Sequence, residues 1–160
     1  MKKNKDELIE WLRDAYAMEK AMEVALEKQI KNEKASPALR EKATIHLAET
    51  QGHAAAVEAC LHKIGADVST LKTGMAQGLE MAKGLSTAFA KDERVKDVLA
   101  AYASEHFEIA CYTALAAAAE QVGVREIVDT CEAILKEEKR MATWLQKNVA
   151  AVVVSYLEEA

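Results

Sequence analysis

The chain has 160 residues, of which 51% are hydrophobic and 29% charged, and a formal net charge of −5. This length suits one domain with a sizeable core, and the acidic balance without a long Lys/Arg run argues against nucleic-acid binding. The longest uncharged apolar runs, 109–119 and 149–154, are too short to span a bilayer. The three cysteines show no Cys-x-x-Cys spacing, and no signal peptide follows Met1, so we expect reduced thiols in a cytoplasmic protein.

Apolar residues recur at helical spacing in four long stretches, and we predict helices over residues 5–32, 37–64, 92–121 and 125–148. Ser36 followed by Pro37 is typical of a helix start, and Gly65 is typical of a helix end. Residues 65–91 are interrupted by glycines, and we expect a long crossover containing a short helix there. The tail, 149–160, is expected to form a short fifth helix or an oligomer contact.

The order of these elements predicts the fold. Two helical hairpins with short turns, joined by one long crossover, form the connectivity of ferritin-like bundles. Good helix formers dominate the composition and a single proline is present, which also favours helices over strands. We therefore expect one all-α domain over residues 1–160, a ferritin-like four-helix bundle of two antiparallel hairpins.

One glutamate on each predicted helix occupies a position where the helical pattern would place an apolar side chain. These are Glu19, Glu49, Glu108 and Glu138. The first two are 49 − 19 = 30 residues apart and the last two 138 − 108 = 30, and a turn lies near the midpoint of each interval. Because both helices rise equally per residue, each hairpin would present two facing carboxylates, and docking the hairpins would bring four together.

Clustered carboxylates inside an apolar core are unfavourable alone, because desolvation and repulsion drive them to bind protons. One or two hard divalent cations remove this conflict by taking oxygen ligands. Glu105 shares a face with Glu108, and His53 lies one turn after Glu49, where a neutral ring nitrogen could bind a metal. The alternative for His53, and the favoured interpretation for His46, is a hydrogen bond to a ligand. The predicted ligands of two iron or manganese ions are Glu19, Glu49, His53, Glu105, Glu108 and Glu138.

An ordinary structural interpretation accompanies each of these residues. A single helix glutamate is most often a solvated surface group, so the metal hypothesis depends on the matched spacing. Tyr16 and Tyr112 are most simply bundle residues whose hydroxyl groups need partners. The methionines are interpreted as core filling, and the cysteines as inert helix residues.

Four segments of the chain resemble the helix signatures of the YciE/YciF-like stress-response family. They are residues 12–20, 46–53, 105–112 and 135–139. This family is similar in fold to rubrerythrin and other ferritin-like proteins. The resemblance implies a dimer-forming bundle with a di-iron-type site in a cytoplasmic, stress-associated protein.

The resemblance also implies ligand roles. It assigns one glutamate on each helix, with the Glu105–Glu108 pair similar to the doubled glutamate on the third helix of rubrerythrin, and His53 similar to the histidine partner. The usual Glu-x-x-His spacing is absent, because Gly52 lies three residues after Glu49 and Met141 three after Glu138. The second histidine is therefore missing, so we expect a site that holds carboxylates alone on one side, binds iron more weakly, or is degenerate.

We expect a di-metal carboxylate protein that acts on O₂ or peroxide in a stress response, as a ferroxidase- or peroxidase-like oxidoreductase, and that forms a homodimer. The alternative is a metal-poor, stress-associated bundle that acts through protein–protein interaction. Iron storage in a hollow shell is a weaker third interpretation, because no sequence feature specifies a large cage.

Overall fold

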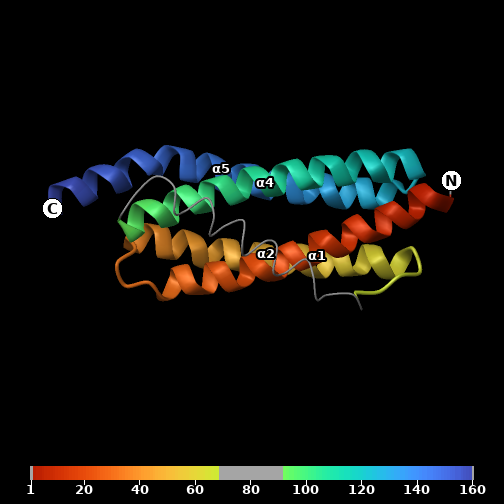
Figure 1. The fold of residues 1–160 in the computed structure, drawn as a ribbon, viewed down its shortest axis with the longest axis horizontal. Helices are drawn as coiled ribbons and strands as arrows, with labels where there is room; N and C mark the ends of the chain where they lie inside the picture. The colour runs from red at the N-terminus through yellow and green to blue at the C-terminus, as the bar shows by residue number, and fades with distance from the viewer. Residues whose placement is uncertain (1, 69–91, 160) are drawn as a thin grey trace.

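The computed structural model describes residues 2–68 and 92–159, and four long helices run through them (Figure 1). They are α1 (Lys2–Lys31), α2 (Pro37–Lys63), α4 (Glu93–Val122) and α5 (Arg125–Glu159). α1 pairs with α2 and α4 with α5 as antiparallel hairpins, and the hairpins pack with α1 against α4 and α2 against α5. The predicted all-α four-helix bundle is confirmed. The short helix predicted within the crossover falls on residues 69–91, outside the described residues.

The two hairpin turns are set by local capping. Ser36 is the N-cap of α2, where its Oγ accepts a hydrogen bond from the Leu39 backbone N–H at 3.2 Å, and Pro37 opens the helix. At the other turn Gly123 adopts a left-handed conformation (φ 82°) that ends α4, and α5 begins two residues later. Short turns keep each pair of helices antiparallel and adjacent.

The tail at 149–160 differs from its predicted form, because α5 continues without interruption to Glu159. The region contains no glycine or proline, and Val149 and Val152 pack against the core at the start of α4. Arg94 near that start donates to the Glu159 carboxylate at 2.6 Å and so ties the end of α5 to α4. Even with this apolar end, none of the described helices is both long and apolar enough to cross a membrane.

The core has apolar ends and a polar middle. One apolar cluster contains Leu12, Leu61, Leu115 and Ile134, and a second contains Leu39, Val98, Met141 and Leu145. On α2, α4 and α5, buried glutamates or histidines fall between the residues of the two clusters, and on α1 Glu19 directly follows Met18 of the first cluster. A buried Leu, Ile or Met contributes about 1.5–3 kcal/mol, so the ends of the bundle offset the cost of burying polar groups at its centre.

Candidate metal centre

Six buried residues from all four helices meet with their side chains at the polar middle of the bundle, and none of these residues as a whole is more than 3% exposed. They are Glu19 from α1, His46 and His53 from α2, Glu105 and Glu108 from α4, and Glu138 from α5. The two histidines are seven residues apart and the two α4 glutamates three apart, spacings that place each pair on one helix face. Local helix geometry therefore directs all six side chains inward.

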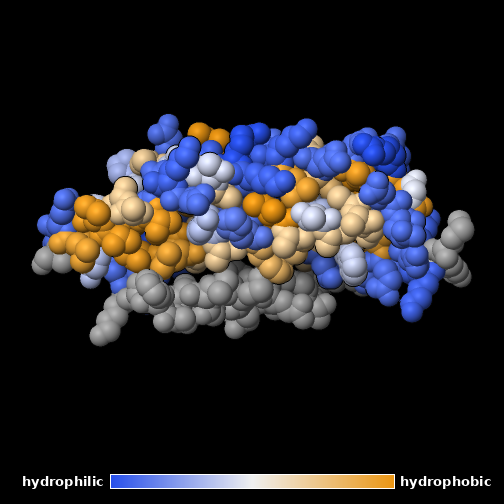
Figure 2. Space-filling view, turned by 90° about the horizontal axis from the view of Figure 1, so that it is seen from above, coloured by the Kyte–Doolittle hydropathy of each residue, from blue (hydrophilic) through white to orange (hydrophobic). Residues whose placement is uncertain are grey.

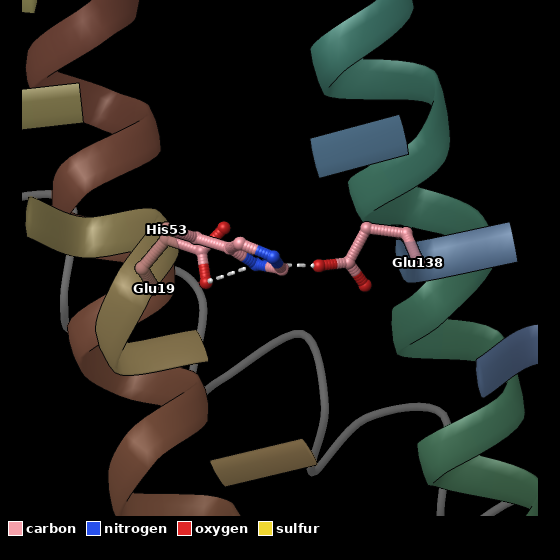
Figure 3. A group of neighbouring side chains, drawn as sticks. All are labelled: Glu19, His53 and Glu138. Carbon is pink, nitrogen blue, oxygen red and sulfur yellow. Dashed lines mark ion pairs between the residues drawn. The ribbon is translucent and has the colours of Figure 1, made fainter. Parts of the chain in front are cut away.

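Five of these side chains form two groups of three that share Glu138, and Glu108 belongs to neither group. In the first trio (Glu19, His53, Glu138), His53 Nδ1 lies 2.9 Å from Glu138 Oε1 and 3.7 Å from Glu19 Oε2 (Figure 3). In the second trio (His46, Glu105, Glu138), His46 Nε2 lies 3.3 Å from Glu105 Oε1 and 3.7 Å from Glu138 Oε2. Each trio can offer three ligand atoms that all lie within 4.8 Å of one another.

Several of the inward atoms have no hydrogen-bond partner within the described residues. They are Glu19 Oε2, His53 Nδ1, Glu105 Oε2, Glu108 Oε2 and both carboxylate oxygens of Glu138. Most buried polar atoms in proteins are hydrogen-bonded, and leaving one unsatisfied costs about 1–3 kcal/mol. Converging carboxylate oxygens and an imidazole nitrogen without partners are the kind of donor set that iron and manganese accept. The residues present therefore fit a divalent metal centre.

The carboxyl groups of the centre differ in their affinity for protons. Burial, reinforced by the charge of Glu138, raises the pKa of Glu108 well above its ordinary value. Burial also raises the pKa of Glu105, to about 8, although a hydrogen bond with His46 opposes this. For Glu138 burial acts in the same direction, but its close contacts with His53 and Glu105 outweigh burial and lower its pKa. Glu138 is therefore the carboxylate that stays ionised.

Both histidines favour the protonated form in the metal-free protein. Burial lowers the pKa of His46, but its hydrogen bond with Glu105 and the surrounding negative charge raise it to about 9. Burial likewise opposes protonation of His53, and its contacts with Glu138 and Glu19 raise the pKa to about 10. Without metal, the protonated imidazoles thus offset part of the negative charge of the carboxylates, and a metal ion must displace their inward protons to reach the ring nitrogens.

Three half-exposed or exposed side chains form an outer ring, defined here as Glu49, Glu137 and Arg140. His46 Nδ1 donates to Glu49 Oε2 at 2.9 Å, and His53 Nε2 donates to Glu137 Oε2 at 2.7 Å. Arg140 Nη2 donates to Glu49 Oε1 at 3.1 Å and lies 3.5 Å from Glu137 Oε1. The outward nitrogen of each histidine is therefore held by a carboxylate.

Four of the six predicted ligands, Glu19, His53, Glu105 and Glu138, lie in the two trios. Glu108 is buried beside the trios but belongs to neither, and Glu49 also lies outside both. The inward line on α2 runs from His46 through Thr50 to His53, at spacings of four and three residues, so Thr50 takes the central position. Glu49 lies at the margin of this face, where its side chain is 21% exposed. His46, favoured as a hydrogen-bond partner, instead has a ring nitrogen inside the second trio.

Sequence reasoning missed the two remaining members of the outer ring. Glu137 and Arg140 are among many charged residues on α5, and nothing in their spacing distinguishes them from solvated side chains. The available signal was Glu137 next to Glu138, because adjacent carboxylates on a helix point about 100° apart and can reach the same histidine from different sides.

Tyr112 joins the centre to the apolar cluster beside it. The tyrosine is fully buried, and its Oη donates to Glu19 Oε1 at 2.5 Å. Burial, together with the negative charge of Glu19, raises the pKa of Tyr112 well above its ordinary value, so the hydroxyl remains a donor. This contact holds the Glu19 carboxylate, leaving its other oxygen directed towards the trio.

Changing Tyr112 to Phe is expected to destabilise the metal-free protein by about 1–3 kcal/mol, because a buried carboxylate oxygen loses its donor. The measurement is urea unfolding followed by circular dichroism. Tyr16→Phe is the matched control, since Tyr16 is only partly buried. Equal losses in the two variants would contradict a specific bond between Tyr112 and Glu19.

Comparisons with known proteins agree with this fold. The chain is 34% identical over 147 residues to Protein YciF from Escherichia coli (strain K12), covering 87% of this chain and 86% of YciF. The crystal structure of the E. coli stress protein YciF superposes with a TM-score of 0.77 at 30% identity, covering 96% of this chain and 98% of that one. The predicted resemblance to YciF is therefore confirmed.

Two further structures extend the comparison. A protein from Xanthomonas campestris pv. campestris has a TM-score of 0.83 at 36% identity, covering 98% of this chain and 97% of that one. A ferritin-like, diiron-carboxylate protein from Bacillus anthracis str. Ames has a TM-score of 0.74 at 20% identity, covering 93% and 99%, which shows the shared fold. A family model, described as a domain of unknown function (DUF892), matches residues 3–158. The chain is a ferritin-like four-helix bundle and belongs to the DUF892 family.

Proposed function

We propose that this protein holds two iron or manganese ions at the centre of the bundle and acts on O₂ or peroxide in a stress response. The observation that carries the proposal is the set of buried carboxylate and imidazole atoms that face one another without hydrogen-bond partners. The similarity to the E. coli stress protein YciF and the fold shared with a diiron-carboxylate protein support it.

The two trios suggest how the ligands divide. We assign one ion to Glu19 and His53 and the other to His46 and Glu105, with Glu138 shared between them. Glu108 lies buried beside these residues with a free carboxylate oxygen, and we add it to the ligand set. Glu49, the remaining predicted ligand, is assigned instead to hold His46.

Iron or manganese, when bound, supplies one-electron redox chemistry with O₂ or peroxide. The chain contributes binding, orientation and exclusion of water. Glu138 brings negative charge between the two ligand groups, and Tyr112 orients Glu19. The apolar clusters on either side of the centre limit access of water along the bundle axis.

Metal content is the direct test of this function. Protein purified without a chelating tag and reconstituted with Fe(II) or Mn(II) under anaerobic conditions is expected to contain about two ions per chain by elemental analysis, in accord with di-metal carboxylate bundles. The iron-loaded form is then expected to consume peroxide. A metal content far below one ion per chain after reconstitution would favour the metal-poor bundle that acts through protein contacts.

Metal affinity is expected to rise with pH between 6 and 8. The folded-state pKa values of Glu105, His46 and His53, about 8, 9 and 10, are above the ordinary values, so protons occupy these groups at low pH and leave as pH rises. Each competing proton steepens the dependence by up to about tenfold per pH unit. Calorimetric titration with Mn(II) measures it, and an affinity that stays constant over this range would contradict ligation by these groups.

We also propose that the protein forms a homodimer through the end of α5. Ala150, Val153, Val154 and Leu157 lie at spacings of three and four, so they share one helix face, and Val154 and Leu157 are 52% and 64% exposed. Figure 2 shows hydrophobic residues gathered at this end of the molecule. An apolar patch on a helix end suits self-association.

Replacing Val154 and Leu157 together by Lys is expected to shift the protein from dimer to monomer, because four buried charges would face one another across a two-fold interface. Sedimentation velocity measures the change. The matched control places lysines at Ala151 and Ser155, two exposed positions on another face of the same turns. A dimer that persists in the first variant would rule out this face as the interface.

A further inference from the structure

The outer ring connects the two histidines of the metal centre through one arginine. We propose that Arg140 is a positioning residue that, through Glu49 and Glu137, orients both imidazoles and so acts on both metal ions. This inference depends on the proposed metal-binding function. It assigns roles to two residues, Glu137 and Arg140, that sequence reasoning did not identify.

Each histidine has one inward and one outward nitrogen, and the two rings are oriented in opposite senses. His46 directs Nε2 into the second trio and donates from Nδ1 to Glu49. His53 directs Nδ1 into the first trio and donates from Nε2 to Glu137. A carboxylate on the outward nitrogen fixes the proton there, so the inward nitrogen keeps its lone pair for a metal.

A single nitrogen of Arg140 serves both carboxylates, at 3.1 Å from Glu49 Oε1 and 3.5 Å from Glu137 Oε1. Exposed ion pairs alone contribute little, because long side chains lose entropy when they are held in place. Here the far oxygen of each carboxylate is already held by a buried histidine, so Arg140 closes a ring whose inner members are fixed. Its charge also offsets the repulsion between two carboxylates held close together.

The outer ring lies at the surface, although it contacts buried histidines. Arg140 is 59% exposed and Glu137 36%, whereas both histidines are at most 4% exposed. The ring therefore lies at the edge between α2 and α5, directly outside the histidines. Among the described residues, ion pairs join Arg140 to the metal centre through Glu49 and Glu137, which makes its effect separable from loss of a ligand.

The test is a Co(II) titration that follows both visible absorbance and heat. Arg140→Gln is expected to weaken binding of both ions on the order of tenfold, and Glu137→Gln to weaken only the ion bound by His53, by about 10–100-fold. Arg140→Lys keeps the charge and is expected to restore part of the affinity. The matched control is Arg125→Gln, an exposed arginine on the same helix that pairs with Asp129.

Proton NMR of the Co(II) protein gives a separate readout for each of the two histidines. The outward imidazole N–H protons shift strongly when the ring binds Co(II), and they exchange slowly with water while a carboxylate holds them. Arg140→Gln is expected to accelerate exchange of both protons and Glu137→Gln of one. Unchanged affinities and exchange in Arg140→Gln, relative to Arg125→Gln, would overturn the inference alone. Absence of Co(II) binding by the unaltered protein would overturn the proposed function together with it.

Discussion

Replacing Glu138 by Gln is expected to abolish tight binding of both metal ions. Glu138 is the member shared by the two trios, and both of its oxygens are without hydrogen-bond partners within the described residues. Burial tends to raise the pKa of Glu138, but its close contacts with His53 and Glu105 lower it, so its carboxylate is ionised and ready to bind a cation. We expect each ion to bind at least about 100-fold more weakly, because loss of an outer partner alone costs about 10–100-fold.

The measurement is calorimetric titration with Mn(II), together with elemental analysis after reconstitution with iron. Glu132→Gln is the control, because Glu132 is an exposed glutamate on the same helix. Circular dichroism of both variants checks that the bundle is folded. Retention of both ions at unchanged affinity in Glu138→Gln would remove the shared carboxylate from the metal centre and leave the two trios as separate structural contacts.

Replacing Glu108 by Gln is expected to stabilise the metal-free protein at pH 8 and to weaken its stabilisation by metal. Burial and neighbouring carboxylates raise the folded-state pKa of Glu108, so the stability it contributes is greatest below its ordinary pKa of 4.5 and is lost as pH rises towards the folded-state value. Glutamine does not ionise and avoids this loss. One pKa unit corresponds to about 1.4 kcal/mol, so we expect a gain of about 1 kcal/mol or more at pH 8 and little gain at pH 5.

Urea unfolding with a chelator, repeated with Mn(II), measures both parts of this expectation. Glu120→Gln provides the control, as an exposed glutamate further along α4. A higher free energy of unfolding without metal, together with a smaller stabilisation by Mn(II), would identify Glu108 as a residue that serves metal binding at a cost in stability. A variant less stable than the unaltered protein at pH 8 without metal would contradict the repulsion that we infer among the buried carboxylates.

The helices and their order could be predicted because they depend on local spacing and capping. Ser36 and Pro37 open α2 as expected, and the apolar periodicity locates all four helices. The end of α5 was harder to predict, because the sequence changes from mixed to apolar near Val149 without a residue that breaks a helix. There a contact distant in sequence, between Arg94 and Glu159, holds the last turn.

The candidate site was only partly predictable, because residue counts locate Cα atoms and not side-chain ends. Glu19 and Glu49 are equally far from their turn, but helix side chains lean towards the N-terminus of their own helix. In an antiparallel pair this moves the two carboxylates apart along the bundle. His53, one turn further along α2, leans back towards Glu19. It therefore occupies the position opposite Glu19 that the equal spacing from the turn predicted for Glu49.

The continuity of α5 sets the spacing between the metal centre and the proposed dimer face. No proline or glycine interrupts the helix between Glu138 and Val154, so these two residues lie about 24 Å apart along one continuous helix. In a dimer joined at the helix ends, the centres of the two protomers would be far apart and would have no ligand in common. Each protomer is therefore expected to load its ions independently of its neighbour, with binding curves that show no cooperativity between subunits.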